Sequence, residues 1–164
     1  MLRVNPATAK FMLDRYVDVK PGDWVIQNAG NSAIGRYLIQ LAKAKGVHSI
    51  NIVRREGLEQ ELTEIGADLV MVEGEDLPEK VRAELEDANI SLAIDAVTGK
   101  ATLNLGSILN EEGTVINYGL LSWEPCQLNA DMVVFKGITP TGFRLAKTLG
   151  GMTAEAKQQL YGEL

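Results

Sequence analysis

The sequence predicts an α/β protein built on a doubly wound, parallel, six-stranded sheet of Rossmann type, with strand order 3-2-1-4-5-6. Two observations carry this prediction. Short apolar runs alternate with segments of helical periodicity along the whole chain, which favours parallel strands joined by right-handed crossovers. The run at residues 91–97 is almost continuously apolar, as a strand buried on both faces should be.

The elements follow in order along the chain. Strands are expected at residues 24–26, 49–53, 68–72, 91–97, 114–118 and 138–143. Helices are expected at 6–17, 34–45, 58–66, 78–88, 100–109, 131–135 and 153–164. The first helix starts at Asn5-Pro6, where a capping side chain precedes a proline. Gly46 and Gly66 end the second and third helices, and apolar residues at helical spacing line one face of each crossover helix.

The totals restrict the class of protein. At 164 residues the chain is one domain, and its net charge of -6 argues against a general nucleic-acid surface. With one cysteine and one histidine, the chain forms no internal disulfide and no Cys/His zinc site. It has no apolar run near 18 residues and no recognisable signal or transit peptide, so we expect a cytoplasmic protein without a membrane segment.

The turn between the first strand and the following helix is rich in small residues. Its spacing is Ala29-x-x-Ser32-x-x-Gly35, with Gly30 as a further small residue, and a strict G-x-G-x-x-G is not present. Unpaired N–H groups and the positive end of the helix dipole make such a helix start suitable for a phosphate. Turns of this kind also join strands to helices without binding any ligand.

The second strand ends in Arg54-Arg55. An NAD-binding unit carries an acidic residue near this point for the ribose 2′-hydroxyl, whereas two guanidiniums suit the 2′-phosphate of NADPH. The same feature argues against a methyltransferase of similar topology. The alternative is that Arg54 and Arg55 only form a solvated strand end.

Several segments together resemble the medium-chain dehydrogenase/reductase superfamily, and in particular its mitochondrial-type 2-enoyl thioester reductases. They are residues 27–36 with the Asn31-Ser32 pair, residues 51–54, Tyr118-Gly119, Phe135-Lys136 and Gly142-Phe143. The resemblance covers essentially all of residues 1–164, but only the NADP-binding half of the family's fold. We therefore expect the family's catalytic domain to lie outside this chain.

The resemblance implies roles for individual residues. Backbone amides of Asn31, Ser32, Ala33 and Ile34 would hold the pyrophosphate, and Arg54 and Arg55 the 2′-phosphate. Tyr118, Gly119 and Leu120 would lie by the nicotinamide ribose, and Phe143 would form a wall beside the nicotinamide. No residue of this chain is implied as catalytic, because the family's tyrosine acid belongs to the other domain. Arg144 departs from the tryptophan that these reductases often carry.

The implied activity is zinc-independent, NADPH-dependent reduction of the 2,3-double bond of an enoyl thioester of coenzyme A or acyl carrier protein, in fatty acid synthesis. The domain alone is expected to be inactive or very weak. A quinone or alkenal reductase of the same superfamily and a non-catalytic NADPH-binding module remain as alternatives. The resemblance also implies a homodimer through residues 138–143, with Pro140 where no ladder bond is made, and the mitochondrial matrix for a eukaryotic protein whose targeting segment has been removed.

Two polar residues have competing interpretations. Tyr118 is a possible proton donor, but no lysine or histidine lies near it in the sequence to lower its pKa, which favours a cleft wall. Asp95, at the end of an apolar strand, is expected to bind backbone amides and cap a turn rather than to act in catalysis.

Overall fold

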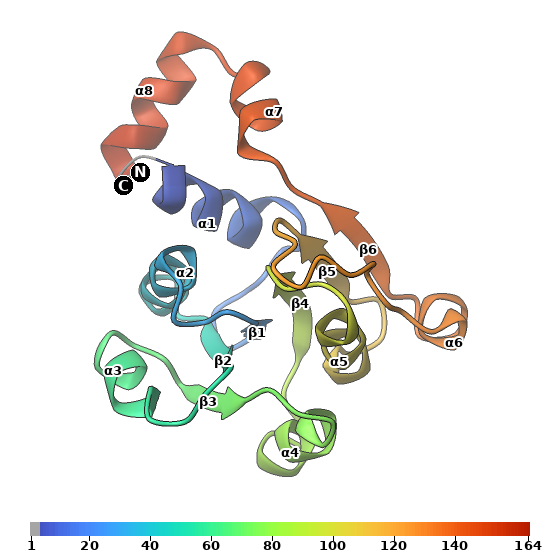
Figure 1. The fold of residues 1–164 in the computed structure, drawn as a ribbon. Helices are drawn as coiled ribbons and strands as arrows, with labels where there is room; N and C mark the ends of the chain where they lie inside the picture. Colours follow the sequence, from blue (N-terminus) through green and yellow to red (C-terminus); the bar gives the residue numbers. More distant parts are fainter. Residues whose placement is uncertain (1–3) are drawn as a thin grey trace.

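The computed structural model describes residues 4–164, and in it six parallel strands form one sheet in the order β3-β2-β1-β4-β5-β6, as predicted (Figure 1). The strands in chain order are β1 Trp24–Gln27, β2 His48–Val53, β3 Leu69–Val72, β4 Ile90–Asp95, β5 Thr114–Asn117 and β6 Thr139–Gly142. The order reverses between β1 and β4, which pair with each other, so a crevice is expected beyond their carboxyl ends.

Helices cover both faces of the sheet (Figure 1). One layer holds α1 Val4–Arg15, α2 Ala33–Ala44 and α3 Glu59–Glu64, and the other holds α4 Leu77–Glu84, α5 Lys100–Ile108 and α6 Ala130–Val134. Two further helices, α7 Leu145–Gly150 and α8 Ala154–Glu163, follow β6 and return to α1. The ends of the described chain are therefore near each other, and Lys10 on α1 lies 3.8 Å from Glu163 on α8.

Each layer has its own apolar core. Phe11 and Met12 of α1, Leu38 of α2 and Leu160 of α8 are buried together on one face. On the other face, Val81 of α4 and Leu105 of α5 are packed against strand residues such as Ile26, Ile50 and Val115. Burying one such side chain contributes roughly 1.5–3 kcal/mol, so these two layers stabilise the sheet from both faces.

Besides small shifts at the ends of elements, one strand end and one helix differ from the sequence prediction. The fourth strand ends at Asp95 rather than residue 97, because the Asp95 carboxylate accepts from the N–H groups of Val97 and Thr98, each at 2.9 Å, and turns the chain. Helix α7 was not predicted. It has only six residues, and its Leu145 and Leu149 pack against the α1 core, so tertiary contact rather than a long periodic pattern stabilises it.

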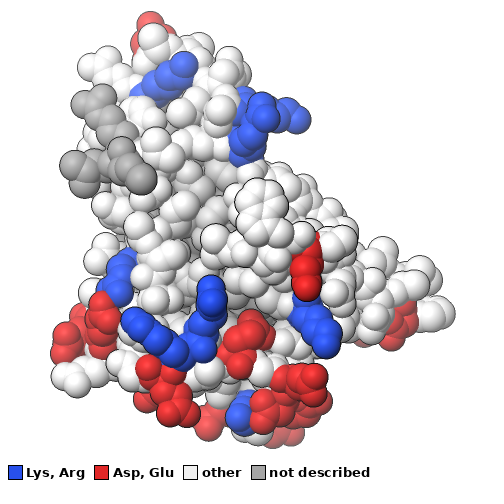
Figure 2. All heavy atoms as spheres, viewed as in Figure 1, with Lys and Arg blue, Asp and Glu red and all other residues white. Residues whose placement is uncertain are grey.

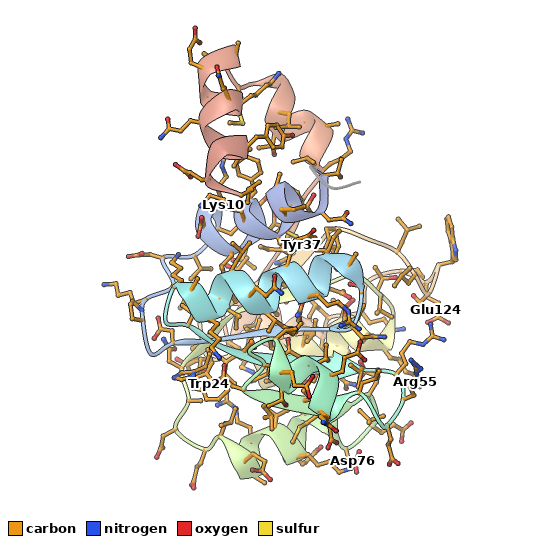
Figure 3. All side chains as sticks on the ribbon, turned by 90° about the vertical axis from the view of Figure 1, so that its left-hand side faces the viewer. Lys10, Trp24, Tyr37, Arg55, Asp76 and Glu124 are labelled. Carbon is orange, nitrogen blue, oxygen red and sulfur yellow. The ribbon has the colours of Figure 1, made fainter. Side chains whose placement is uncertain are left out.

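The carboxyl ends of the strands form one end of the molecule. In Figure 3, Trp24, the first residue of β1, lies at the opposite end from Arg55, Asp76 and Glu124. Arg55 follows β2, Asp76 follows β3, and Glu124 lies in the loop after β5. The loops that follow three different strands therefore gather at this end.

Candidate functional site

The turn between β1 and α2 is built so that the backbone folds closely on itself. Ala29 has a positive φ of 49°, which is uncommon for a residue with a side chain. A Cβ added to Gly35 would lie 2.6 Å from the carbonyl oxygen of Gly30, and one added to Gly30 would lie 3.0 Å from the Cβ of Asn51. The two glycines thus let α2 start directly against the end of β1 and against β2.

Buried side chains hold this turn in place from the side of the sheet. The Gln27 Nε2 group donates to the Gly35 carbonyl at 2.9 Å and to Asn51 Oδ1 at 2.8 Å, and all of these groups are buried. On the outer side, Arg36 Nε donates to the Asn31 carbonyl at 3.0 Å. The β1–α2 turn is therefore held at both ends by hydrogen bonds to charged or amide side chains, which favours a single conformation.

The start of α2 presents backbone donors. Ala33 and Ile34 are its first two residues, so their N–H groups have no helical acceptor, and within residues 4–164 neither these two nor the Asn31 N–H has another partner. Ser32 differs from the prediction, because its N–H already donates to the Ala29 carbonyl at 3.0 Å. Its side chain caps the helix by accepting from the Gly35 N–H at 3.1 Å.

Arg54 and Arg55 line the same hollow as this turn. The hollow has a volume of ≈ 470 Å³, and Ala29, Asn31, Ser32, Leu58 and Leu121 complete its walls. In the described part of the chain neither guanidinium has an ion pair or a hydrogen bond. Two unpaired cations thus lie beside three unpaired backbone donors, which is an arrangement suited to an anion with more than one phosphate group.

A second hollow of ≈ 260 Å³ continues on the other side of Ser32. It shares Ala29, Ser32 and Leu121 with the first hollow and is closed by Ile34, Tyr118 and Gly119, among other residues. Burial raises the pKa of the Tyr118 hydroxyl to about 12; the hydrogen bond with the Ser32 side chain acts against this shift, and the nearby charge of Asp95 adds to it. Tyr118 is therefore neutral at physiological pH and forms a wall of this second hollow.

The two hollows form one cleft across the carboxyl ends of β1, β2 and β5, with the helix start in its middle. We call this the β1–α2 cleft, and define it by Asn31, Ser32, Arg54, Tyr118 and Leu121. The same end of the molecule is seen in Figure 2, where acidic side chains gather along the lower margin and most of the surface above them is neither acidic nor basic.

A buried network fixes the floor between β4 and β5. Asp95 is fully buried, and its carboxylate accepts from five neutral donors: two backbone N–H groups, Asn28 Nδ2 at 2.7 Å, Thr102 Oγ1 at 2.5 Å and Asn117 Nδ2 at 2.5 Å. The Asn28 side chain in turn accepts from the Ala96 N–H at 2.7 Å. This confirms the interpretation of Asp95 as a residue that binds backbone amides.

Two of the predicted site residues do not line either hollow. Phe143 is 8% exposed and packs in the α1 core, with ring centroids 6.3 Å from Phe11 and 6.4 Å from Tyr16, and its place beside the nicotinamide stays a prediction. Its N–H donates to the Asn117 carbonyl of β5 at 2.9 Å. Leu120 is 51% exposed, and it is Leu121 that lines both hollows.

Three residues that form or support the β1–α2 cleft were not predicted from the sequence. Leu121 is held over the cleft because its N–H donates to the Ala96 carbonyl at 3.1 Å. Asn5, at the start of α1, lines the Tyr118 side of the cleft, far from it in sequence. Arg36 acts indirectly by binding the Asn31 carbonyl. For Arg36, the only signal in the sequence is its position in the first turn of the helix that follows the β1–α2 turn. The positions of Leu121 and Asn5 depend on tertiary contacts and could not be predicted.

Other sites of interest are limited. Within residues 4–164, no group of three or more His, Cys, Asp or Glu side chains is arranged to hold a metal ion. None of the helices described in this structure combines the length and apolarity needed to cross a membrane. Cys126 is an exposed free thiol in the loop after β5.

The parallel sheet, its switch in strand order and the glycine-bearing turn at the start of α2 define a Rossmann-type domain. The sequence profile of the zinc-binding dehydrogenase family matches residues 33–160, and this chain belongs to that family. The resemblance to medium-chain dehydrogenases/reductases that the sequence indicated is thereby confirmed.

Curated relatives include mitochondrial enoyl-[acyl-carrier-protein] reductases. The protein from Dictyostelium discoideum is 36% identical over 166 residues, and the match covers 98% of this chain and 47% of the relative. The protein from Caenorhabditis elegans is 38% identical over 165 residues, covering 97% and 46%. This chain therefore spans about half the length of the curated relatives it matches.

Solved structures agree. The mitochondrial 2-enoyl thioester reductase Etr1p/Etr2p heterodimer from Candida tropicalis superimposes with a TM-score of 0.91 at 31% identity, covering 99% of this chain and 48% of that one. A complex of Etr1p with NADP and crotonyl-CoA gives the same values. The matched half of these enzymes has the fold described above.

Proposed function

We propose that residues 1–164 are the NADPH-binding domain of an enoyl thioester reductase. The observation that carries this proposal is the pair of unpaired guanidiniums, Arg54 and Arg55, in one hollow with the helix start at Ser32. An NAD site needs a carboxylate for the ribose hydroxyls at the end of the second strand, and this chain has cations there.

The β1–α2 cleft divides into parts that fit a phosphorylated dinucleotide. The free N–H groups of Asn31, Ala33 and Ile34 would donate to the pyrophosphate, and the dipole of the 12-residue helix α2 favours its charge. Arg54 and Arg55 would bind the 2′-phosphate. The nicotinamide riboside would then extend toward Tyr118 and Gly119, on the other side of Ser32.

The proposed reaction is reduction of the 2,3-double bond of an enoyl thioester of coenzyme A or acyl carrier protein. When bound, NADPH supplies the hydride. The relatives named above are enoyl reductases, and one matched structure is described as a complex with NADP and crotonyl-CoA. Within this chain, residues bind and orient the dinucleotide. Tyr118, with a pKa of about 12, is poorly suited to protonate the α-carbon, so we place that acid in the half of the enzyme to which these residues do not correspond.

A quinone reductase is the second candidate. A structure described as a putative NADPH:quinone reductase from Bacillus thuringiensis matches with a TM-score of 0.84 at 26% identity, covering 96% of this chain. Both candidates share the proposed nucleotide contacts, so only the acceptor distinguishes them.

The test separates cofactor from substrate. NADPH and NADH are titrated into the purified chain and followed by the fluorescence of the reduced nicotinamide; we expect NADPH to bind at least about tenfold more tightly, the value of one hydrogen bond to a charged group. Equal affinity, or no binding, would remove the proposal. Turnover of crotonyl-CoA and of a benzoquinone is then compared in the full-length protein that carries this domain, and a preference for the quinone would select the second candidate.

We also propose a homodimer through the edge strand β6, because β6 is the last strand of the sheet described here and its outer edge can pair with a second copy of itself. The N–H groups of Thr139 and Phe143 donate to β5, so by alternation those of positions 140 and 142 face outward, and residue 140 is a proline. In an antiparallel pair centred on Thr141, Gly142 N–H of each protomer would donate to the Pro140 carbonyl of the other. The Gly142 carbonyl, which such a pair leaves without a donor, accepts from the Tyr16 hydroxyl at 3.3 Å.

The proposed location of the protein in the cell rests on the names of its relatives. Those described above are named as mitochondrial. For a eukaryotic source we therefore propose the mitochondrial matrix, and for a bacterial one the cytoplasm. Fractionation of the source cell, with detection of this chain in a membrane-free matrix or cytoplasmic extract, tests this.

A further inference from the structure

The loop after β5 exposes large apolar side chains that take no part in the proposed nucleotide contacts. Trp123 is 84% exposed, and Leu120 in the same loop is 51% exposed. None of the segments that carry the resemblance to enoyl thioester reductases includes residues 120–134. Contiguous exposed apolar side chains often mark a surface that binds a ligand or a partner. We call Leu120 and Trp123 together the Trp123 platform.

The base of this loop is fixed to the loop after β4. The Leu121 N–H donates to the Ala96 carbonyl at 3.1 Å, and the Ser122 N–H donates to the Val97 carbonyl at 2.8 Å. The hydroxyl oxygens of Ser122 and Thr98 are hydrogen-bonded at 2.8 Å. The indole of the next residue is therefore carried by a turn that is anchored to the sheet, although the indole itself is exposed.

Trp123 is held in a backbone conformation that is uncommon for a bulky residue. Its φ is 58°, in the left-handed region, and its N–H donates to the Leu120 carbonyl at 3.0 Å, which closes the turn. Thr98, on the other side of the contact with Ser122, also has a positive φ of 71°. Strain of this kind persists only where the surrounding structure imposes it, and it is concentrated at functional sites. Since the indole is not buried, the strained turn orients it toward a group outside the domain.

The Trp123 platform lies at the nicotinamide end of the β1–α2 cleft. Gly119 and Leu121 line the second hollow, and the Cα atom of Trp123 is within ~7 Å of that of Leu121, because two residues of chain span no more. Figure 3 places Glu124, of the same loop, at the end of the molecule that also holds Arg55. Hydride transfer brings the reacting atoms to roughly 3–3.5 Å, so an acceptor in contact with the nicotinamide lies next to this loop.

The charge of the loop favours the hydrocarbon end of an enoyl thioester over its other end. Glu124 is exposed and has no ion pair within residues 4–164. Its carboxylate lies against the loop after β4, because a Cβ added to Gly99 would be 2.7 Å from Glu124 Oε2. This carboxylate repels the phosphate-bearing coenzyme A or carrier-protein end of the substrate, whereas a hydrocarbon chain carries no charge.

We propose that Leu120 and Trp123 bind the hydrocarbon chain of a longer enoyl thioester, and so determine the acyl-chain preference of the enzyme. This inference rests on the proposed function, because it takes the nicotinamide to lie beside Tyr118 and Gly119. A crotonyl group ends directly after the double bond, whereas a decenoyl group continues well beyond it and reaches the platform. Each buried methylene changes affinity about fourfold, so contact with two of them gives roughly a tenfold preference.

The experiment measures kcat/KM for trans-2-decenoyl-CoA and for crotonyl-CoA with NADPH, in the full-length protein that carries this domain. The wild type is expected to prefer the decenoyl thioester roughly tenfold. In Trp123→Ala this ratio is expected to fall to about one, whereas Trp123→Phe, which keeps an apolar ring, should retain most of it. Cys126→Ala changes an exposed side chain of the same loop outside the platform, and it is the control that should keep the wild-type ratio.

The outcomes separate this inference from the proposed function. A wild-type ratio near one overturns the chain-length assignment and leaves the proposed function in place. A ratio that Trp123→Ala leaves unchanged also overturns the assignment, including the case in which both thioesters lose activity equally. Reduction of neither thioester by the wild type overturns the proposed function, and the chain-length assignment with it.

Discussion

Removal of a single guanidinium at the end of β2 is the most informative perturbation of the cleft. Arg54→Ala deletes a cation that has no ion pair or hydrogen bond within residues 4–164, so the substitution leaves no buried partner unsatisfied. The side chain is also exposed, and its loss creates no cavity. We therefore expect the fold to be retained and the whole effect to appear in ligand binding.

The magnitude follows from the same observations. A hydrogen bond to a charged group contributes about 1.5–3 kcal/mol, and about 1.4 kcal/mol is a tenfold change in affinity. Because Arg55 lines the same hollow and remains, the lower part of the range applies. Arg54→Ala is thus expected to weaken NADPH roughly tenfold and NADH less than twofold, and the NADPH effect should shrink as salt is raised, since exposed charges are screened.

The assay is titration of NADPH and NADH at low and moderate salt, followed by nicotinamide fluorescence. Lys43→Ala is the matched control, because Lys43 is a cation on α2 that lines a different hollow, together with His48 and Asp68. The control should bind both dinucleotides as the wild type does. An equal loss of NADPH and NADH affinity in Arg54→Ala would refute the reasoning, because it would mean that Arg54 does not contact the 2′-phosphate.

Three further perturbations probe other parts of the account. Gly35→Ala places a Cβ 2.6 Å from the Gly30 carbonyl oxygen, so we expect a loss of about 1–3 kcal/mol in the free energy of unfolding by urea, together with weaker NADPH binding; wild-type stability would contradict the described turn. In the folded protein the pKa of Tyr118 is about 12, against 10.0 for a free tyrosine, so the stability that its neutral form contributes is full below pH 10 and is lost as the pH rises through 12. Relative to Tyr118→Phe, the free energy of unfolding of the wild type should therefore fall by about 1.4 kcal/mol between pH 9 and pH 11. A difference between the two proteins that does not change with pH would refute the burial of Tyr118. Thr141→Asp brings two carboxylates together at the proposed dimer axis and should yield monomers in light scattering, whereas Ala146→Asp on α7 should not; a wild-type monomer would end the dimer proposal.

The fold could be predicted from the sequence because the same pattern recurs along the chain. Each apolar run is followed by a helix with one apolar face, and right-handed crossovers then leave few possible sheet orders. The position of the β1–α2 turn was predictable for the same reason, since Gly30 and Gly35 are needed where α2 packs closely against β1 and β2. Arg54 and Arg55 were predicted from their distance along the chain, and the structure places both beside that turn.

The details that sequence could not supply depend on backbone direction and on tertiary packing. Whether the Ser32 N–H is free depends on the conformation of Ala29, whose carbonyl accepts from it. The direction of the Phe143 side chain, which packs near Phe11, depends on which face of β6 meets α1. Leu121 rather than Leu120 covers the cleft because of one hydrogen bond to the Ala96 carbonyl.

Binding of the isolated adenosine portion of the cofactor tests the central claim most directly. Adenosine 2′,5′-bisphosphate and 5′-AMP differ only in the 2′-phosphate, so calorimetric titration of both into the wild-type chain measures what Arg54 and Arg55 contribute. We predict that the bisphosphate binds at least about tenfold more tightly. Indistinguishable affinities would contradict the account.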